Sequence, residues 1–213
     1  MENPLSLLRK TEMKPGTARE WEDAHLKHAE EEFTHHDVYE QPYGWSFSRR
    51  NVSFHSGEIV LCAFSCILIH GDLPSVMYQG GHYPEPKQRL SWLAAGNLDY
   101  VAGKVQLGKK ETFVHEVALL QAQEYFDSFK AEGKTPFDNC YCPFDPNEYD
   151  LLVEMIKDRD DDHKIREHLY EISDNDAEMV ADFGMATDTD VIWTYAAARH
   201  VWEVVKNNGC RKR

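Results

Sequence analysis

The pattern of apolar and polar positions predicts a helix, then a group of strands, then more helices along the 213-residue chain. A Thr-x-x-Glu capping box at residues 17–20 predicts a first helix over residues 18–33. On that helix Trp21, His25 and His28 share one face, because they are four and three residues apart. We therefore expect an N-terminal amphipathic helix.

Segments rich in β-branched and aromatic residues follow and predict a mostly antiparallel sheet. The predicted strands cover residues 43–48, 51–55, 58–70, 75–81 and 98–107, with a short helix at 89–96. The segment 58–70, EIVLCAFSCILIH, is apolar at nearly every position, which indicates one central strand covered on both faces. On a single strand Cys62 and Cys66 would stand about 13 Å apart at ~3.3 Å per residue, too far for a disulfide.

From residue 110 onward the apolar period changes to that of helices. The predicted helices cover residues 110–133, 148–158, 163–172, 175–183 and 191–206. Strands cluster first and helices cluster afterwards, which is typical of an α+β fold rather than an α/β fold. We expect an N-terminal helix and β-sheet region at 1–109 and a helical region packed on it at 110–213, with a single domain as the alternative.

The net charge of −14 is unevenly distributed. Residues 138–190 hold seventeen acidic residues against four basic ones, and residues 20–40 hold eight against one. Such regions exclude direct binding of nucleic acid there and favour a protein partner with a basic surface. The alternative is that the charge serves only to keep the protein soluble.

Cysteine usage and the first residues bear on the cellular compartment. Five cysteines, with two closely spaced pairs, do not form a disulfide framework and indicate reduced thiols. The beginning, MENPLSLLRK, lacks the features of a secretory signal, and no apolar run is long enough for a membrane span. We expect a cytoplasmic, intracellular protein without a membrane segment.

The stretch HLKHAEEEFTHHD at residues 25–37 carries four histidines and four acidic residues. On a helix His25, His28 and Glu32 lie within two turns and are candidates for metal ligands. The polar surroundings, however, are typical of the solvated side of an amphipathic helix. We expect no metal here and no cofactor elsewhere in the chain.

Past the predicted end of this helix, His35, His36 and Asp37 lie where the chain turns toward the sheet. Functional residues concentrate on such connections, so these three are candidate catalytic residues. His55 and His82 lie near the predicted strand ends and could converge on them. A histidine and carboxylate site of this kind would serve a hydrolase, with or without a metal.

The acidic residues after position 157 contain a partial calcium-loop pattern. Asp158, Asp160 and Asp162 match its first three ligands, but His163 and Leu169 occupy the positions that require Gly and Glu. Helix capping explains these acids better than calcium binding does. The candidates for contact with a basic partner are Asp158, Asp160, Asp161, Asp162, Asp174 and Asp176.

Three functional hypotheses remain from the sequence. The leading one is a non-enzymatic binding protein, an inhibitor or adaptor that engages a basic protein surface, since no complete catalytic motif is present. The alternative is the hydrolase described above. The third is a subunit that forms a homo-oligomer through the C-terminal helix, with Tyr195, Trp202 and Val205 at the interface.

Overall fold

The computed structural model describes residues 18–50, 56–62, 65–72, 74–80, 83–132, 146–172 and 177–211. The fold is α+β as predicted, with an N-terminal helix, an antiparallel six-stranded sheet and helices in the C-terminal part. The contacts divide the chain into a helical unit (Met1–Trp21 and Phe113–Ala186) and a sheet unit (Glu22–Thr112 and Thr187–Arg213). The expected boundary between residues 109 and 110 stays a prediction, and the last helix belongs to the sheet unit.

The first described helix, α2, runs over Ala18–Phe33, the range that the capping box predicts. Its buried residues are Glu22, His25, Ala29 and Phe33, spaced three, four and four apart. This spacing places them on one face of a helix. The inner face of α2 thus includes a carboxylate and an imidazole.

The sheet is a meander in which each strand pairs antiparallel with the next. Its strands are β1 (His36–Gln41), β2 (Gly44–Arg49), β3 (Ser56–Leu61), β4 (Cys66–Gly71), β5 (Val76–Gln79) and β6 (Val105–Leu107). Strands β2 and β5 correspond to predicted strands, and β1 was not predicted. The predicted strand 51–55 lies outside the described residues.

The prediction of one strand over residues 58–70 is wrong, because this segment forms the β3–β4 hairpin. The chain reverses near Ser65, whose φ of 64° lies in the left-handed region. A left-handed residue is typical of the tight reversal between two antiparallel strands. Antiparallel strands that are apolar on both faces read as one continuous apolar run, so the sequence pattern could not reveal the turn.

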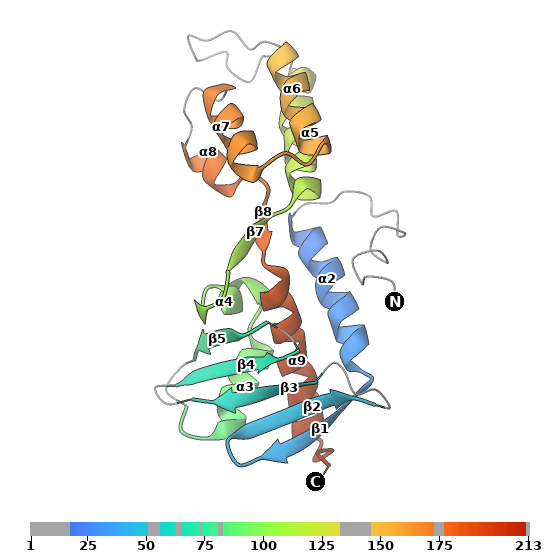
Figure 1. The fold of residues 1–213 in the computed structure, drawn as a ribbon, viewed down its shortest axis with the longest axis vertical. Helices are drawn as coiled ribbons and strands as arrows, with labels where there is room; N and C mark the ends of the chain where they lie inside the picture. Colours follow the sequence, from blue (N-terminus) through green and yellow to red (C-terminus); the bar gives the residue numbers. More distant parts are fainter. Residues whose placement is uncertain are drawn as a thin grey trace. The chain divides into compact units, whose positions relative to one another are not determined.

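One face of the sheet forms the core of the sheet unit. Ile59, Ile69 and Val76 are direct cross-strand neighbours on this face and are all buried. Helices α3 (Pro86–Ala95) and α9 (Thr189–Lys206) pack together on the same side of the sheet (Figure 1). The last helix therefore closes the core that the strands begin.

The predicted strand 98–107 is wrong in its first half, which forms the helix α4 (Leu98–Ala102). Asn97 caps this helix, because its side-chain oxygen accepts a hydrogen bond of 2.8 Å from the backbone N–H of Tyr100. Such a cap satisfies a backbone N–H at the beginning of a helix, which would otherwise lack a partner within the helix. The prediction of a strand did not consider this cap. Only the second half of the segment forms a strand, β6.

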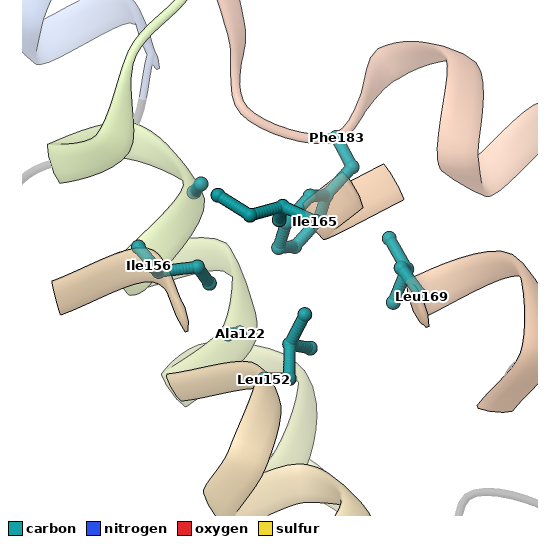
Figure 2. Close-up of a cluster of buried hydrophobic side chains, with 7 residues drawn as sticks. Ala122, Leu152, Ile156, Ile165, Leu169 and Phe183 are labelled. Atoms are coloured by element: carbon teal, nitrogen blue, oxygen red, sulfur yellow. The ribbon is translucent and has the colours of Figure 1, made fainter. Parts of the chain in front are cut away.

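The helical unit has its own hydrophobic core. Its helices are α5 (His115–Glu132), α6 (Pro146–Lys157), α7 (Asp162–Ile172) and α8 (Ala177–Asp182), and the short strands β7 (Glu111–Phe113) and β8 (Met185–Thr187) pair with each other. Figure 2 shows the core, which consists of Ala118, Ala122, Leu152, Ile156, Ile165, Leu169 and Phe183. In the described part of the chain, no helix has the length and apolar character needed to span a membrane.

Two adjacent leucines on α6 test this core. We expect Leu152→Ala to lower the free energy of unfolding by about 2–5 kcal/mol, because Leu152 is fully buried and its truncation leaves a cavity. Leu151 is 45% exposed, so Leu151→Ala should change stability by no more than about 0.5 kcal/mol. Urea unfolding followed by circular dichroism measures both. Equal losses for the two variants would contradict this core assignment.

Candidate functional site

The candidate metal ligands on α2 have separate surroundings. His25 is 7% exposed, and His28 meets the ring of Trp193 edge-on with ring centroids 5.9 Å apart. Glu32 forms an ion pair with Arg49 at 3.3 Å. The expectation of a polar, solvated setting is therefore wrong for His25, which is buried. Among the residues described, no three histidine, cysteine or acidic side chains gather to hold a metal ion.

The candidate catalytic residues at 35–37 also separate. His35 is exposed, whereas His36 is 5% exposed and lies on the core side of β1. Asp37 points to the other face, since neighbouring side chains alternate along a strand. Its carboxylate oxygens bind Arg50 Nε at 2.8 Å and Arg211 Nη1 at 2.7 Å. These three side chains share no site, and Asp37 ties the chain near its C-terminus to β1.

His36 and the half-buried His200 belong to an aromatic layer around Phe33. The Phe33 ring contacts those of His36, Phe47 and Trp193 at centroid distances of 5.0, 5.6 and 5.8 Å. The Nε2 atom of His200 lies 3.2 Å from the backbone oxygen of His36. A protonated Nε2 can donate to that carbonyl while the imidazole is neutral.

Burial lowers the pKa of His200 below its usual value of 6.5. The nearby Arg50 lowers this pKa further, whereas the hydrogen bond with His36 and the charge of Asp37 raise it. Desolvation is the largest of these influences, so the neutral imidazole is favoured in the folded chain. His200 is thus a packing histidine of the sheet unit.

Four of the candidate residues cannot be assigned a position. His55, His82, Asp174 and Asp176 lie outside the described residues. Any role for them stays a prediction.

The acidic turn, defined here as residues 158–162, joins α6 to α7. Helix α6 ends in a Schellman arrangement, in which the N–H of Asp160 donates to the backbone oxygen of Met155 at 3.0 Å. The intervening Arg159 has a φ of 57°, the left-handed conformation that this ending requires. Asp161 then caps α7, because its Oδ1 accepts from the N–H of His163 at 3.0 Å. Local hydrogen bonds therefore fix the backbone of the turn.

Contacts with α5 hold the acidic turn within the helical unit. The His115 Nε2 atom lies 3.0 Å from the backbone oxygen of Asp160, and Arg159 forms an ion pair with Glu116. The side chains of Asp158, Asp161 and Asp162 remain exposed. Only Asp161 makes the capping bond that the sequence predicts for this segment.

Sequence reasoning missed a cavity of about 730 Å³ in the sheet unit. Its lining includes the aromatic residues Tyr83, Trp92, Tyr100 and Trp202 together with Lys87. The size lies within the range of small-molecule pockets, about 300–1,000 Å³. The residues come from α3, α4, α9 and the segment before α3. Because these segments are far apart in the sequence, no short motif indicates the cavity.

The side chains proposed for oligomerisation are unequally accessible. Tyr195 and Val205 are each 3% exposed, and the Tyr195 hydroxyl donates to the backbone oxygen of Gly96 at 2.6 Å. Trp202 is half-buried and lines the cavity. A homo-oligomer through α9 stays a prediction, and of the three proposed side chains Trp202 is the one that is not fully buried.

Comparisons with protein families, curated proteins and solved structures found no match for this chain.

The depressed pKa of His200 predicts a pH-dependent stability. The folded chain binds this proton less tightly than the unfolded chain does, so the contribution of the neutral imidazole is full above a pH of about 6.5 and is lost as the pH falls below it. We expect His200→Gln to reduce the loss of stability between about pH 7.5 and 5.5. Urea unfolding across this range measures it, with His35→Gln, at an exposed position, as the control. Parallel pH profiles for wild type and His200→Gln would contradict the argument.

The contacts of Asp37 predict a structural role. We expect Asp37→Asn to lower the free energy of unfolding by about 1–3 kcal/mol, because two charge-assisted hydrogen bonds are lost from a carboxylate whose side chain is 10% exposed. Glu40→Gln, at an exposed position on the same strand, should cost no more than about 0.5 kcal/mol. Denaturant unfolding compares the pair. A stable Asp37→Asn variant would argue against this role.

Proposed function

We propose that this chain is a non-enzymatic binding protein of the cytoplasm, an inhibitor or adaptor, that engages a basic protein surface through the acidic turn. The observation that carries the proposal is the arrangement of four aspartates within five residues of a capped turn. The backbone of this turn is already ordered, so little of its conformational entropy is lost on binding. A preformed acidic corner suits a rigid, lysine- or arginine-rich partner.

The charge around the turn supports a basic partner. Residues 146–172 carry nine acidic residues against four basic ones. Eight of the nine acidic side chains are exposed, and the remaining one, Asp160, is half-buried. Clustered charge of one sign raises the rate of encounter with an oppositely charged surface and disfavours partners of like charge. Nucleic acid is a poor partner for this segment, since its phosphates carry the same sign.

Asp161 has a structural role in the acidic turn, so a test of binding should change other aspartates. Asp161 stabilises the beginning of α7 and is a poor residue for a binding test, because its replacement would disturb the helix. Among the described residues, Asp158 and Asp162 make no ion pair. Charge reversal at these two positions breaks no ion pair, and a lysine in place of Asp162 in the first turn of α7 should cost only about 1 kcal/mol through the helix dipole.

The hydrolase hypothesis stays a prediction, because two of its five catalytic candidates lie outside the described residues. Of the other three, His36 is enclosed in the aromatic layer and Asp37 is paired with two arginines. No observation in the described part of the chain favours it over binding.

The proposal predicts a partner whose affinity depends on salt and on the acidic turn. Partners captured on the folded chain would be purified and their dissociation constants measured at about 0.05 and 0.5 M salt, a range over which screening strengthens markedly. We expect Asp158→Lys with Asp162→Lys to weaken binding by roughly tenfold or more at the lower salt concentration.

The matched control is Glu167→Lys with Glu171→Lys, which reverses two exposed charges on α7 away from the turn. Both double variants change the net charge equally, so a specific role for the turn requires a larger loss from the first. An affinity that does not change with salt concentration, or an equal loss of affinity in both double variants, would refute the proposed surface.

A further inference from the structure

Neighbouring groups hold the aromatic rings of the cavity in the sheet unit. The Trp92 ring of α3 meets the Tyr100 ring of α4 edge-on, with ring centroids 6.0 Å apart. Lys104 Nζ lies 5.0 Å from the centroid of the Tyr100 ring, and a Cβ atom at Gly80 would lie only 3.3 Å from the Trp92 ring. Both rings are therefore packed before a ligand binds, so little side-chain entropy is lost on binding.

The cavity is accessible from solvent and includes one side of α3. Lys87, Ser91 and Ala95 line it and are spaced four residues apart, which places them on the same face of this helix. The aromatic residues Tyr83 and Tyr100 are 38% and 47% exposed. A ligand can therefore reach the rings in the folded chain.

The side chains that line the cavity supply more hydrogen-bond donors than acceptors. An indole N–H and an ammonium group only donate, whereas hydroxyl and carboxamide groups both donate and accept. The polar side chains of the lining are Tyr83, Lys87, Gln88, Ser91, Trp92, Tyr100 and Trp202. Among the described residues, none of these side chains has a hydrogen-bond partner. The lining is thus suited to a ligand that presents acceptors.

A proline-rich segment is such a ligand. Proline has no backbone N–H, and a polyproline II helix leaves its carbonyl groups free to accept hydrogen bonds. Proline-rich segments bind to aromatic-lined grooves, and their preformed conformation limits the entropy lost on binding. The combination of four aromatic rings and unused donors therefore favours this class of ligand.

The charge of the lining adds a preference within this class. Lys87 is its only charged residue, and no described carboxylate forms an ion pair with Lys87. An acidic residue of the ligand would complement this ammonium group, and a basic residue would be repelled. We propose that the cavity binds a proline-rich segment of a partner protein, with an acidic residue of the segment paired with Lys87. This site is separate from the acidic turn, which belongs to the helical unit.

The first test compares three synthetic peptides of about ten residues, which form roughly three turns of polyproline II helix. One peptide has proline at every position except a central aspartate, the second has a central lysine instead, and the third has alanine in place of every proline of the first. Calorimetric titration of the folded chain measures binding. We expect a dissociation constant below about 1 mM for the first peptide, weaker binding by about threefold or more for the second, and no measurable binding for the third.

Matched variants locate the binding site. Tyr100→Ala should weaken binding of the aspartate peptide by about tenfold, because an aromatic contact is lost. Its control is Tyr43→Ala, since Tyr43 is 76% exposed and lies outside the lining. Lys87→Glu should reverse the preference between the aspartate and lysine peptides, whereas Lys27→Glu, at an exposed position on α2, should preserve it.

Three outcomes would overturn the proposal. The first is no binding of the aspartate peptide at millimolar concentration, and the second is equal binding of the alanine peptide. The third is an equal loss of affinity in Tyr100→Ala and Tyr43→Ala. An unchanged peptide preference in Lys87→Glu would refute the pairing with Lys87. Circular dichroism of each variant checks that the fold is retained, and Lys87→Glu, a change at an exposed position, provides a test that does not remove a packed ring.

Discussion

Burial of α9 against the core face of the sheet is the interaction on which the sheet unit depends. Val191, Ala198 and Val205 of this helix are buried, and so are Ile69 and Tyr78 of the sheet. The contact joins segments separated by more than a hundred residues of chain. Burial of one large aliphatic side chain contributes about 1.5–3 kcal/mol, so a helix with many such residues supplies much of the stability of this unit.

The same contact requires buried polar groups to find partners. The Tyr78 hydroxyl lies 2.5 Å from Thr194 Oγ1 and donates to the Val191 carbonyl at 3.2 Å. Burial raises the pKa of Tyr78 well above its usual range, so the phenol stays protonated and can donate. Glu22 follows the same rule just before α9 begins, where its Oε1 accepts from the Thr187 N–H at 2.6 Å. Such groups make the docking of α9 specific as well as favourable.

Acidic side chains have different surroundings in the two units. The acidic turn of the helical unit has an ordered backbone and exposed carboxylates, which suits recognition of a basic surface. In the sheet unit, Asp37 is bound to Arg50 and Arg211, and Glu32 is bound to Arg49. Asp161 of the helical unit has a structural role without a cation, because it caps α7. Local acid content alone does not distinguish these uses.

The α+β class, the bounds of α2 and the positions of most helices could be predicted from the sequence, because capping and helical periodicity act over a few residues. The sequence also shows the acidic character of residues 158–162. The division of residues 58–70 into two strands and the burial of His25 and His36 are visible only in the folded chain. These features depend on which segments pack together. The local sequence around an apolar or ionisable residue is the same whether or not a distant segment buries that residue.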